Sequence, residues 1–168
     1  MKNGSKSVVV KKALFLDRDG VINFDPDDYT KSLSEFQVLP GVIETLKQWF
    51  NAGYILIIVT NQGGLAKGRY TKDVVHAIHQ YFQGLCIQSG FVIAHFYFCS
   101  HHIDSFRCLC RKPGSLMIEK GLHHFNLDAS ECILIGDRQR DIDAAISAGV
   151  RGILIERNSR IPKPEEVC

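Results

Sequence analysis

The stretch Ala13-Leu14-Phe15-Leu16-Asp17-Arg18-Asp19-Gly20 decides the fold of this 168-residue chain, because an apolar run ends there in two acids and a glycine. An apolar run that stops at such a signal is typical of a buried strand followed by a turn. A strand end is a rigid mount, so two carboxylates two residues apart can face one small polar ligand. Taken alone, the residues suit an Asx turn equally well. The rest of the chain has to separate the two interpretations.

Strand and helix patterns alternate along the whole chain. Apolar runs predict strands within residues 8–16, 54–59, 94–99, 132–135 and 152–155, and helical periodicity predicts helices over 42–52, 71–88, 116–125 and 141–148. Continuous apolar strands are expected where both faces of a parallel sheet are covered. We therefore predict a doubly wound, Rossmann-like α/β sandwich. In such a fold, ligands bind beyond the carboxyl ends of the strands.

Size and composition limit the function classes. Hydrophobic residues make up 45% of the chain, charged residues 23%, and the net charge is only +2, which gives no argument for a nucleic-acid or membrane partner. The apolar runs are too short to span a bilayer, and the N-terminus lacks the apolar region of a signal peptide. We expect a single cytoplasmic domain over residues 1–168, monomeric, with a core at about 8–156 and flexible ends.

Polar clusters follow the predicted strands, and the fold would bring them to one edge of the sheet. They are Asp17 and Asp19, the run Thr60-Asn61-Gln62, the pair Arg111-Lys112, and the run from Gly136-Asp137 to Asp141. A hydroxyl, a lysine and several carboxylates are what phosphoryl transfer through an aspartyl intermediate requires. An aspartate that faces a phosphate dianion also needs a cation to neutralise charge, and Mg²⁺ prefers few carboxylates together with phosphate and water.

In order and spacing, these clusters resemble the haloacid dehalogenase superfamily of phosphatases. Its pattern is a strand ending in Asp-x-Asp, a second strand ending in Thr or Ser, a downstream Lys and an acidic Gly-Asp motif, and all four are present. The resemblance implies that Asp17 attacks phosphorus, and that Asp19 protonates the leaving alcohol and then activates water. It also implies that Thr60 and Lys112 hold the phosphoryl oxygens.

The same resemblance implies a magnesium site. Asp137 would bind Mg²⁺ together with the Asp17 carboxylate and the backbone carbonyl of Asp19, and Asp141 would support that site. For Asp141 an alternative stays open, because an acid at a helix start stabilises the helix dipole without any catalytic role. No insertion is large enough to form a separate cap domain, so loops must govern access.

A cysteine-rich loop leads directly into Arg111-Lys112. Its Cys-x-His and Cys-x-Cys spacings place three thiolates and one imidazole within twelve residues, which suits a closed, structural zinc site. The predicted zinc ligands are Cys99, His101, Cys108 and Cys110. His102 competes with His101 as the fourth ligand, and the spacing favours His101.

The run Cys-x-His…Cys-x-Cys-Arg-Lys-Pro is similar to that of the small capless phosphatases, which act on heptose bisphosphate or on histidinol phosphate. Residues 15–23 and 59–71 are closer to the heptose enzymes, whereas Ser100 replaces a usual proline and Arg138 matches the histidinol type. We predict first that the protein removes the 7-phosphate of D-glycero-D-manno-heptose 1,7-bisphosphate. The alternative is hydrolysis of histidinol phosphate. A catalytically idle, zinc-stabilised binding domain is a third, disfavoured because both Asp17 and Asp19 are present.

The resemblance also implies which residues touch the substrate, a small phosphorylated sugar. The sugar and its second phosphate would contact Asp25, Tyr29, Asn61, Gln62 and Arg111. Further selectivity for that phosphate could come from basic residues that would otherwise form a solvated rim, namely Lys67, Arg69, Arg138 and Arg140.

Overall fold

The computed structural model describes residues 11–104 and 107–168. Its strands are β1 (Lys12–Leu16), β2 (Tyr54–Asn61), β3 (His95–Cys99), β4 (Ile133–Gly136) and β5 (Arg151–Leu154). Its α-helices are α1 (Val42–Asn51), α2 (Lys72–Gln88), α3 (Leu116–Phe125) and α4 (Gln139–Ser147). Short 3₁₀ turns lie at Leu33–Glu35, Ala129–Glu131 and Pro164–Glu166.

The five strands form one sheet in the order β3-β2-β1-β4-β5, and every neighbouring pair is parallel. From β1 the chain moves outward through β2 to β3, and then returns to the other side of β1 for β4 and β5. The strand order therefore reverses between β1 and β4, which is where ligands bind in doubly wound sheets. The predicted fold class is confirmed.

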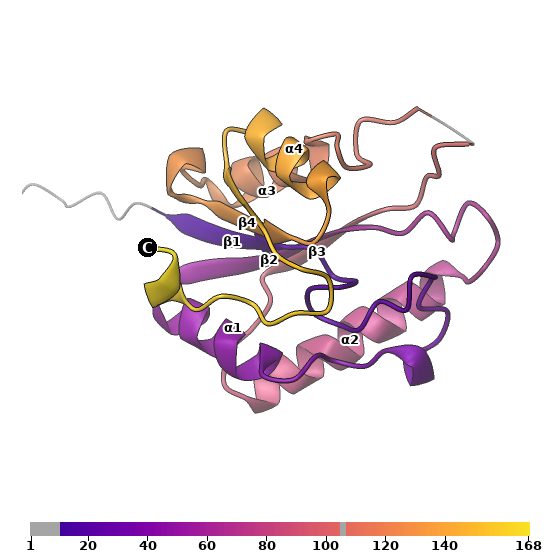
Figure 1. Cartoon of the computed structure of the whole chain (residues 1–168), viewed down its shortest axis with the longest axis horizontal. Coiled ribbons are helices and arrows are strands. Elements are labelled where there is room, and N and C mark those ends of the chain that lie inside the picture. The colour runs from indigo at the N-terminus through magenta and orange to yellow at the C-terminus, as the bar shows by residue number, and fades with distance from the viewer. Residues whose placement is uncertain (1–10, 105–106) are drawn as a thin grey trace, which may run out of the picture.

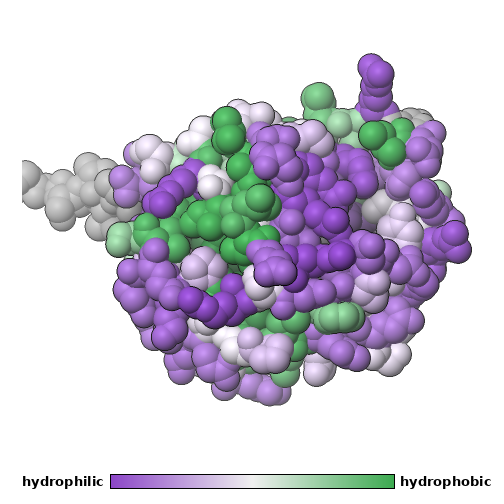
Figure 2. Space-filling model, viewed as in Figure 1, coloured by the Kyte–Doolittle hydropathy of each residue, from purple (hydrophilic) through white to green (hydrophobic). Residues whose placement is uncertain are grey.

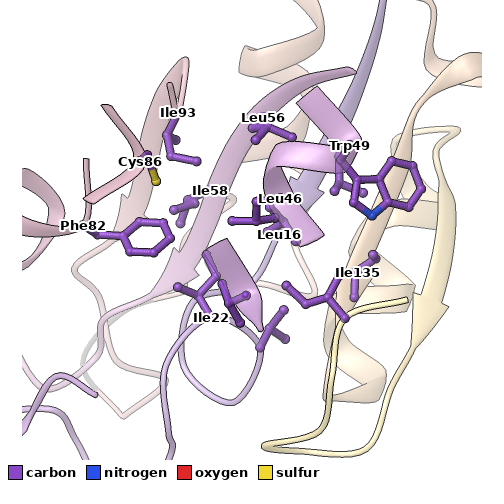
Figure 3. Close-up of a cluster of buried hydrophobic side chains, with 14 of the residues drawn as sticks. Leu16, Ile22, Leu46, Trp49, Leu56, Ile58, Phe82, Cys86, Ile93 and Ile135 are labelled. Carbon is purple, nitrogen blue, oxygen red and sulfur yellow. The ribbon is translucent and has the colours of Figure 1, made fainter. Parts of the chain in front are cut away.

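Helices cover both faces of the sheet: α1 and α2 lie on one side, and α3 and α4 on the other (Figure 1). Because side chains alternate along a strand, β1 feeds both layers. Leu16 packs toward α1 and α2 with Trp49 and Phe82, as Figure 3 shows, whereas Phe15 packs with Met117 toward α3. The central strands β1, β2 and β4 are buried on both sides, so their ends are held rigidly, whereas the edge strand β5 is partly exposed.

Helix α4 begins at Gln139, two residues before the predicted start at Asp141. Arg138 is the N-cap residue, and the Asp141 carboxylate accepts a hydrogen bond from the Arg138 backbone N–H at 3.0 Å. An acid in the third helical position that reaches back to the cap is a capping box, so the acid marks the first turn and not the first residue. The first predicted strand begins at Lys12, and its residues 8–10 lie outside the described part of the chain.

The C-terminal segment is packed, which corrects the expectation that it would be flexible. Ile161 is 2% exposed and belongs to the core on the α1 side. Trp49 donates its indole N–H to the carbonyl of Pro162 at 2.8 Å, and the Tyr54 hydroxyl lies 3.1 Å from the Cys168 sulfur. The sequence of this segment is mostly charged residues and prolines. The single apolar Ile161 forms no periodic pattern, so its packing against the core could not be predicted.

Hydrophilic residues are concentrated right of centre in Figure 2. This is the side at which the carboxyl ends of the strands lie. Apolar side chains gather on the opposite half of the same view. No helix among the described residues is long and apolar enough to cross a membrane.

Candidate active site

Asp17 lies at the point where β1 ends, and it is held there by the sheet. Its backbone N–H donates to the carbonyl of Ile135 at 3.0 Å, which extends the pairing of β1 with β4 by one residue. The Lys112 ammonium lies 2.9 Å from Asp17 and 2.7 Å from Asp141, and it donates to the carbonyl of Val59 at 2.8 Å. All three charged side chains are almost fully buried. Asp17 and Lys112, which are far apart in the sequence and were both predicted to act on the phosphate, are therefore in contact.

Burial and charge act in opposite directions on this pair. Burial raises the pKa of Asp17 to about 7, although the neighbouring Lys112 lowers it. Burial lowers the pKa of Lys112, but the carboxylates of Asp141 and Asp17 outweigh it, so the net pKa is raised. The ammonium therefore stays charged.

Asp137 follows β4 and points at Asp17. Oxygen atoms of Asp17, Asp137 and Asp141 all lie within 4.8 Å of one another. Burial raises the pKa of Asp137, and both of its carboxylate oxygens are buried without a hydrogen bond, although one lies 3.2 Å from the Arg138 Nε. Buried carboxylate oxygens without donors indicate a missing cation, and an all-oxygen set suits a hard one such as Mg²⁺. The residues fit the predicted metal.

The turn after β1 passes so close to this cluster that only glycine fits. Gly20 has φ +85°, and a Cβ there would lie 2.6 Å from an oxygen of Asp137. A side chain would be strained by the backbone conformation and would also occupy the space beside the carboxylate.

Asp19 is in a different environment from Asp17. Its Oδ1 accepts hydrogen bonds from Arg18 at 2.9 and 3.1 Å and from Asn23 at 3.0 Å, and its Oδ2 accepts from Gln62 at 2.9 Å and from Arg18 at 3.0 Å. Burial raises the pKa of Asp19, but the charge of Arg18 and these hydrogen bonds outweigh it, so the net pKa is lowered. Without a metal or substrate, Asp17 thus has the higher pKa and Asp19 the lower, which is the reverse of a nucleophile and a general acid. A cation bound by Asp17 would lower its pKa, and a phosphate dianion beside Asp19 would raise that of Asp19.

The polar residues at the end of β2 and directly after it make hydrogen bonds within the protein. Thr60 is 1% exposed, and its hydroxyl accepts from Gln62 at 2.9 Å. Asn61 holds the backbone of Lys112 from both sides: its Oδ1 accepts from the Lys112 N–H and its Nδ2 donates to the carbonyl, each at 3.0 Å. The side chains of Asn61 and Gln62, predicted as substrate contacts, are thus engaged within the site itself.

A polar pocket of about 360 Å³ opens beside Asp19. All six predicted substrate contacts line it: Asp25, Tyr29, Asn61, Gln62, Arg111 and Arg138. Arg140 also lines it, whereas Lys67 and Arg69 do not. Sequence reasoning missed Thr30, Tyr70 and His102, which reach the pocket from three separate loops and carry no motif.

Ion pairs close the rim of this pocket. Arg138 lies 3.3 Å from both Asp25 and Asp27, and Arg157 pairs with the same two acids. Arg157 belongs to the C-terminal segment that was expected to be flexible. Its position could not be predicted, because nothing in a charged, proline-rich tail indicates a return to the active-site edge.

The predicted zinc ligands form a compact cluster. The sulfur atoms of Cys99, Cys108 and Cys110 lie 3.2 to 3.6 Å apart, and the Nδ1 of His101 lies 3.4 Å from Cys110 and 3.6 Å from Cys99. With bonds of about 2.3 Å to sulfur and 2.0 Å to nitrogen, a tetrahedral zinc ion needs ligand separations of about 3.5–3.8 Å. The residues therefore fit zinc.

His102 is directed away from the cluster. Its Nδ1 accepts from the Asp104 backbone N–H at 3.2 Å and lies 3.0 Å from the Asp104 carboxylate. The geometry groups His101, and not His102, with the three thiols.

Comparisons with known proteins identify the family of this chain. The model of the HAD-hydrolase-like family matches residues 109–166. The D-glycero-beta-D-manno-heptose-1,7-bisphosphate 7-phosphatase of Pseudomonas putida is 34% identical over 86% of this chain and 82% of its own length. The enzyme of the same name from Neisseria meningitidis serogroup A is 38% identical over 86% of this chain and 76% of its own.

Solved structures give the same result. The D,D-heptose 1,7-bisphosphate phosphatase of B. bronchiseptica, complexed with magnesium and phosphate, aligns with a TM-score of 0.81 at 34% identity and covers 86% of this chain and 80% of that one. A putative HAD-like phosphatase of Mesorhizobium loti aligns with the same TM-score at 25% identity, over 94% of this chain and 82% of that one. The chain therefore belongs to the heptose-1,7-bisphosphate 7-phosphatase family of HAD-like phosphatases.

Proposed function

We propose that this protein is a Mg²⁺-dependent phosphatase that removes the 7-phosphate of D-glycero-β-D-manno-heptose 1,7-bisphosphate through an aspartyl-phosphate on Asp17. The observation that carries the proposal is the contact of Asp17 with Lys112 at 2.9 Å beside the hydrogen-bond-free carboxylate of Asp137. A nucleophile, a cation for the phosphoryl oxygens and a metal ligand thereby meet at one edge of the sheet. The substrate is taken from the names of the relatives.

In the first step an oxygen of Asp17 attacks phosphorus, and the bond from phosphorus to the sugar O7 breaks. Asp19 gives its proton to the departing oxygen, so the sugar leaves as a neutral alcohol. Lys112 and the Thr60 hydroxyl hold the phosphoryl oxygens as negative charge builds on them.

In the second step a water molecule attacks the phosphorus of the aspartyl-phosphate. Asp19, now a carboxylate stabilised by Arg18 and Asn23, accepts the water proton. The bond from phosphorus to the Asp17 oxygen breaks, which releases phosphate, restores the Asp17 carboxylate and leaves Asp19 protonated for the next cycle. The sum is ester plus water giving alcohol plus phosphate.

The metal would be held by the carboxylates of Asp17 and Asp137 and by the backbone carbonyl of Asp19. Mg²⁺ there supplies the positive charge that lets a carboxylate approach a phosphate dianion. Asp141 supports the site from behind, because its carboxylate engages Lys112 and the start of α4. In the loop, Zn²⁺ on Cys99, His101, Cys108 and Cys110 would have a structural role.

The pocket beside Asp19 suits the remainder of a bisphosphate. Arg111 and Arg140 line it and can meet a second phosphate, whereas Arg138 lines it in ion pairs with Asp25 and Asp27 that a phosphate would have to share. The remaining lone pairs of the Asp25 carboxylate can accept hydrogen bonds from sugar hydroxyls. Histidinol phosphate would instead need free acids for its imidazole and ammonium groups. The acids of this pocket are paired, Asp25 and Asp27 with arginines and Asp28 with Lys31.

We also propose a single catalytic domain that works as a cytoplasmic monomer. One sheet joins the described elements, which supports a single domain. Six unpaired cysteines support a reducing compartment.

The decisive experiment measures phosphate release from a panel of phosphomonoesters with Mg²⁺ present. The heptose 1,7-bisphosphate should be hydrolysed with the highest kcat/KM and yield the 1-phosphate. Higher kcat/KM for histidinol phosphate would replace the substrate assignment. If no ester in the panel were hydrolysed, the phosphatase proposal itself would fail.

A further inference from the structure

Gln62 lies at the centre of a hydrogen-bond network that joins the acid–base residue to the phosphate site. It is 2% exposed, and its backbone N–H donates to the carbonyl of Cys99 at 2.7 Å. That contact continues the pairing of β2 with β3 beyond the strand end, so the backbone of Gln62 is fixed by the sheet. Its side chain then reaches across the site toward Asp19.

Both N–H donors of the Gln62 amide are used. Its Nε2 donates to Asp19 Oδ2 and to Thr60 Oγ1, each at 2.9 Å, and its Oε1 accepts from the Tyr70 hydroxyl at 2.7 Å. A primary amide has two N–H hydrogens, and both are committed here. No donor of Gln62 is left for a sugar hydroxyl or a phosphate, which argues against a direct role in binding substrate.

Chemistry fixes the orientation of the amide. A carboxylate can only accept hydrogen bonds, so the NH₂ end must face Asp19 and the oxygen must face Tyr70. Tyr70 must then donate, and burial raises the pKa of its hydroxyl, which keeps the proton in place. If the amide turned over, its oxygen would face the Asp19 carboxylate and its NH₂ the tyrosine.

Close packing fixes the Tyr70 ring, so that its hydroxyl stays within hydrogen-bond distance of Gln62. A Cβ at residue 64 would lie 2.3 Å from the ring, so only Gly64 leaves room for it. Tyr29 packs edge-on against the ring at a centroid distance of 5.9 Å. Replacement by phenylalanine would keep both contacts and remove the hydroxyl alone.

We propose that Gln62, oriented by Tyr70, is a positioning residue that sets the hydrogen-bond polarity of the two groups flanking the transferred phosphoryl group. By donating to Thr60 it occupies an acceptor site of that hydroxyl, which leaves the Thr60 hydrogen available for a phosphoryl oxygen. By donating to Asp19 Oδ2 it adds to the hydrogen bonds of Arg18, which reach both carboxylate oxygens, and of Asn23, which reaches Oδ1. The inference rests on the proposed function and deepens it.

Steady-state kinetics of three variants test the proposal: Gln62→Met, Tyr70→Phe and the double variant. Loss of hydrogen bonds to a charged group should lower kcat of Gln62→Met by about 10- to 100-fold, with KM within about twofold. Tyr70→Phe should lower kcat by about 2- to 10-fold. Because Tyr70 acts only through Gln62, Tyr70→Phe should have no further effect in the Gln62→Met protein.

Each contrary result has its own meaning. A rise in KM with kcat retained would make Gln62 a substrate contact, and additive effects in the double variant would remove Tyr70 from the network; either overturns the proposal. If Gln62→Met does not fold, Gln62→Leu, which is similar in size and has no donor, replaces it and should show the same loss of kcat. Tyr81→Phe, which removes an exposed hydroxyl on α2, is the control and should behave as wild type. Failure of the proposed function is recognised separately, because the wild-type protein would then hydrolyse no phosphomonoester.

Discussion

Two regions of this molecule gather metal-ligating groups, and they are built in opposite ways. The catalytic floor consists of Asp17, Thr60, Lys112, Asp137 and Asp141, and three adjacent strands and the start of α4 position it. The zinc loop, residues 99–110, has neither helix nor strand among its described residues after Cys99. The floor should therefore keep its shape when its cation is removed, whereas the loop should not.

The largest effect is expected from Asp17→Asn. The amide keeps the size of the side chain but cannot act as the nucleophile, so phosphate release should fall by more than about 1,000-fold. Zinc content and the thermal midpoint should stay at or above the wild-type values, because strands and not the carboxylate hold the floor. Substantial turnover by a pure preparation would remove Asp17 from the nucleophile role.

Cys108→Ala should affect the loop and leave the sheet in place. Loss of one of four ligands should weaken zinc binding by more than about 100-fold and lower the thermal midpoint, both measurable on the purified protein. Cys168→Ser is the matched control, because this exposed cysteine lies far along the chain from the loop. A Cys108→Ala protein with a full complement of zinc would refute the proposed site.

The Cys108→Ala variant should also affect Arg111 and Lys112, the two residues that follow the loop, to different degrees. Lys112 is held by Asn61, Val59, Asp17 and Asp141, whereas Arg111 is anchored through its hydrogen bond to the carbonyl of His101 at 3.1 Å. Zinc loss should therefore raise KM for a bisphosphate by about tenfold, the value of one charged contact, and change kcat much less. A collapse of kcat at unchanged KM would show that the loop also positions Lys112.

The contrast between the two regions also explains what the sequence could predict. The clustering of Asp17 with Asp137 and of the three cysteines with His101 was predictable, because strand ends and short ligand spacings are local patterns. The partners that set their chemistry were not. Gln62 was predicted to touch substrate, but its contacts with Asp19 and Tyr70 depend on how three loops meet. Arg157 arrives from a tail with no apolar periodicity, and only the burial of Ile161 brings it to the pocket.

The floor should also respond to pH when the metal is removed. Burial raises the pKa of Asp17 from 3.8 to about 7, so the folded state binds a proton more tightly than the unfolded chain. This contribution to stability is complete below about pH 4 and is lost as the pH rises through 7. In the presence of a chelator, the free energy of unfolding should decline over that window, and Asp17→Asn should show a flatter dependence. Equal slopes for both proteins, measured by denaturant unfolding, would contradict the raised pKa.

The smallest effect is expected from His102→Ala, measured beside His101→Ala. The Nδ1 of His101 lies 3.4 Å from the sulfur of Cys110, whereas His102 turns to Asp104 and lines the substrate pocket. His101→Ala should therefore lose zinc, and His102→Ala should retain one zinc per chain with a thermal midpoint close to that of wild type. Metal analysis of the two purified variants decides the matter, because the substitutions are chemically identical and adjacent. Zinc loss in His102→Ala with retention in His101→Ala would exchange the two residues and require the loop to fold differently around the ion.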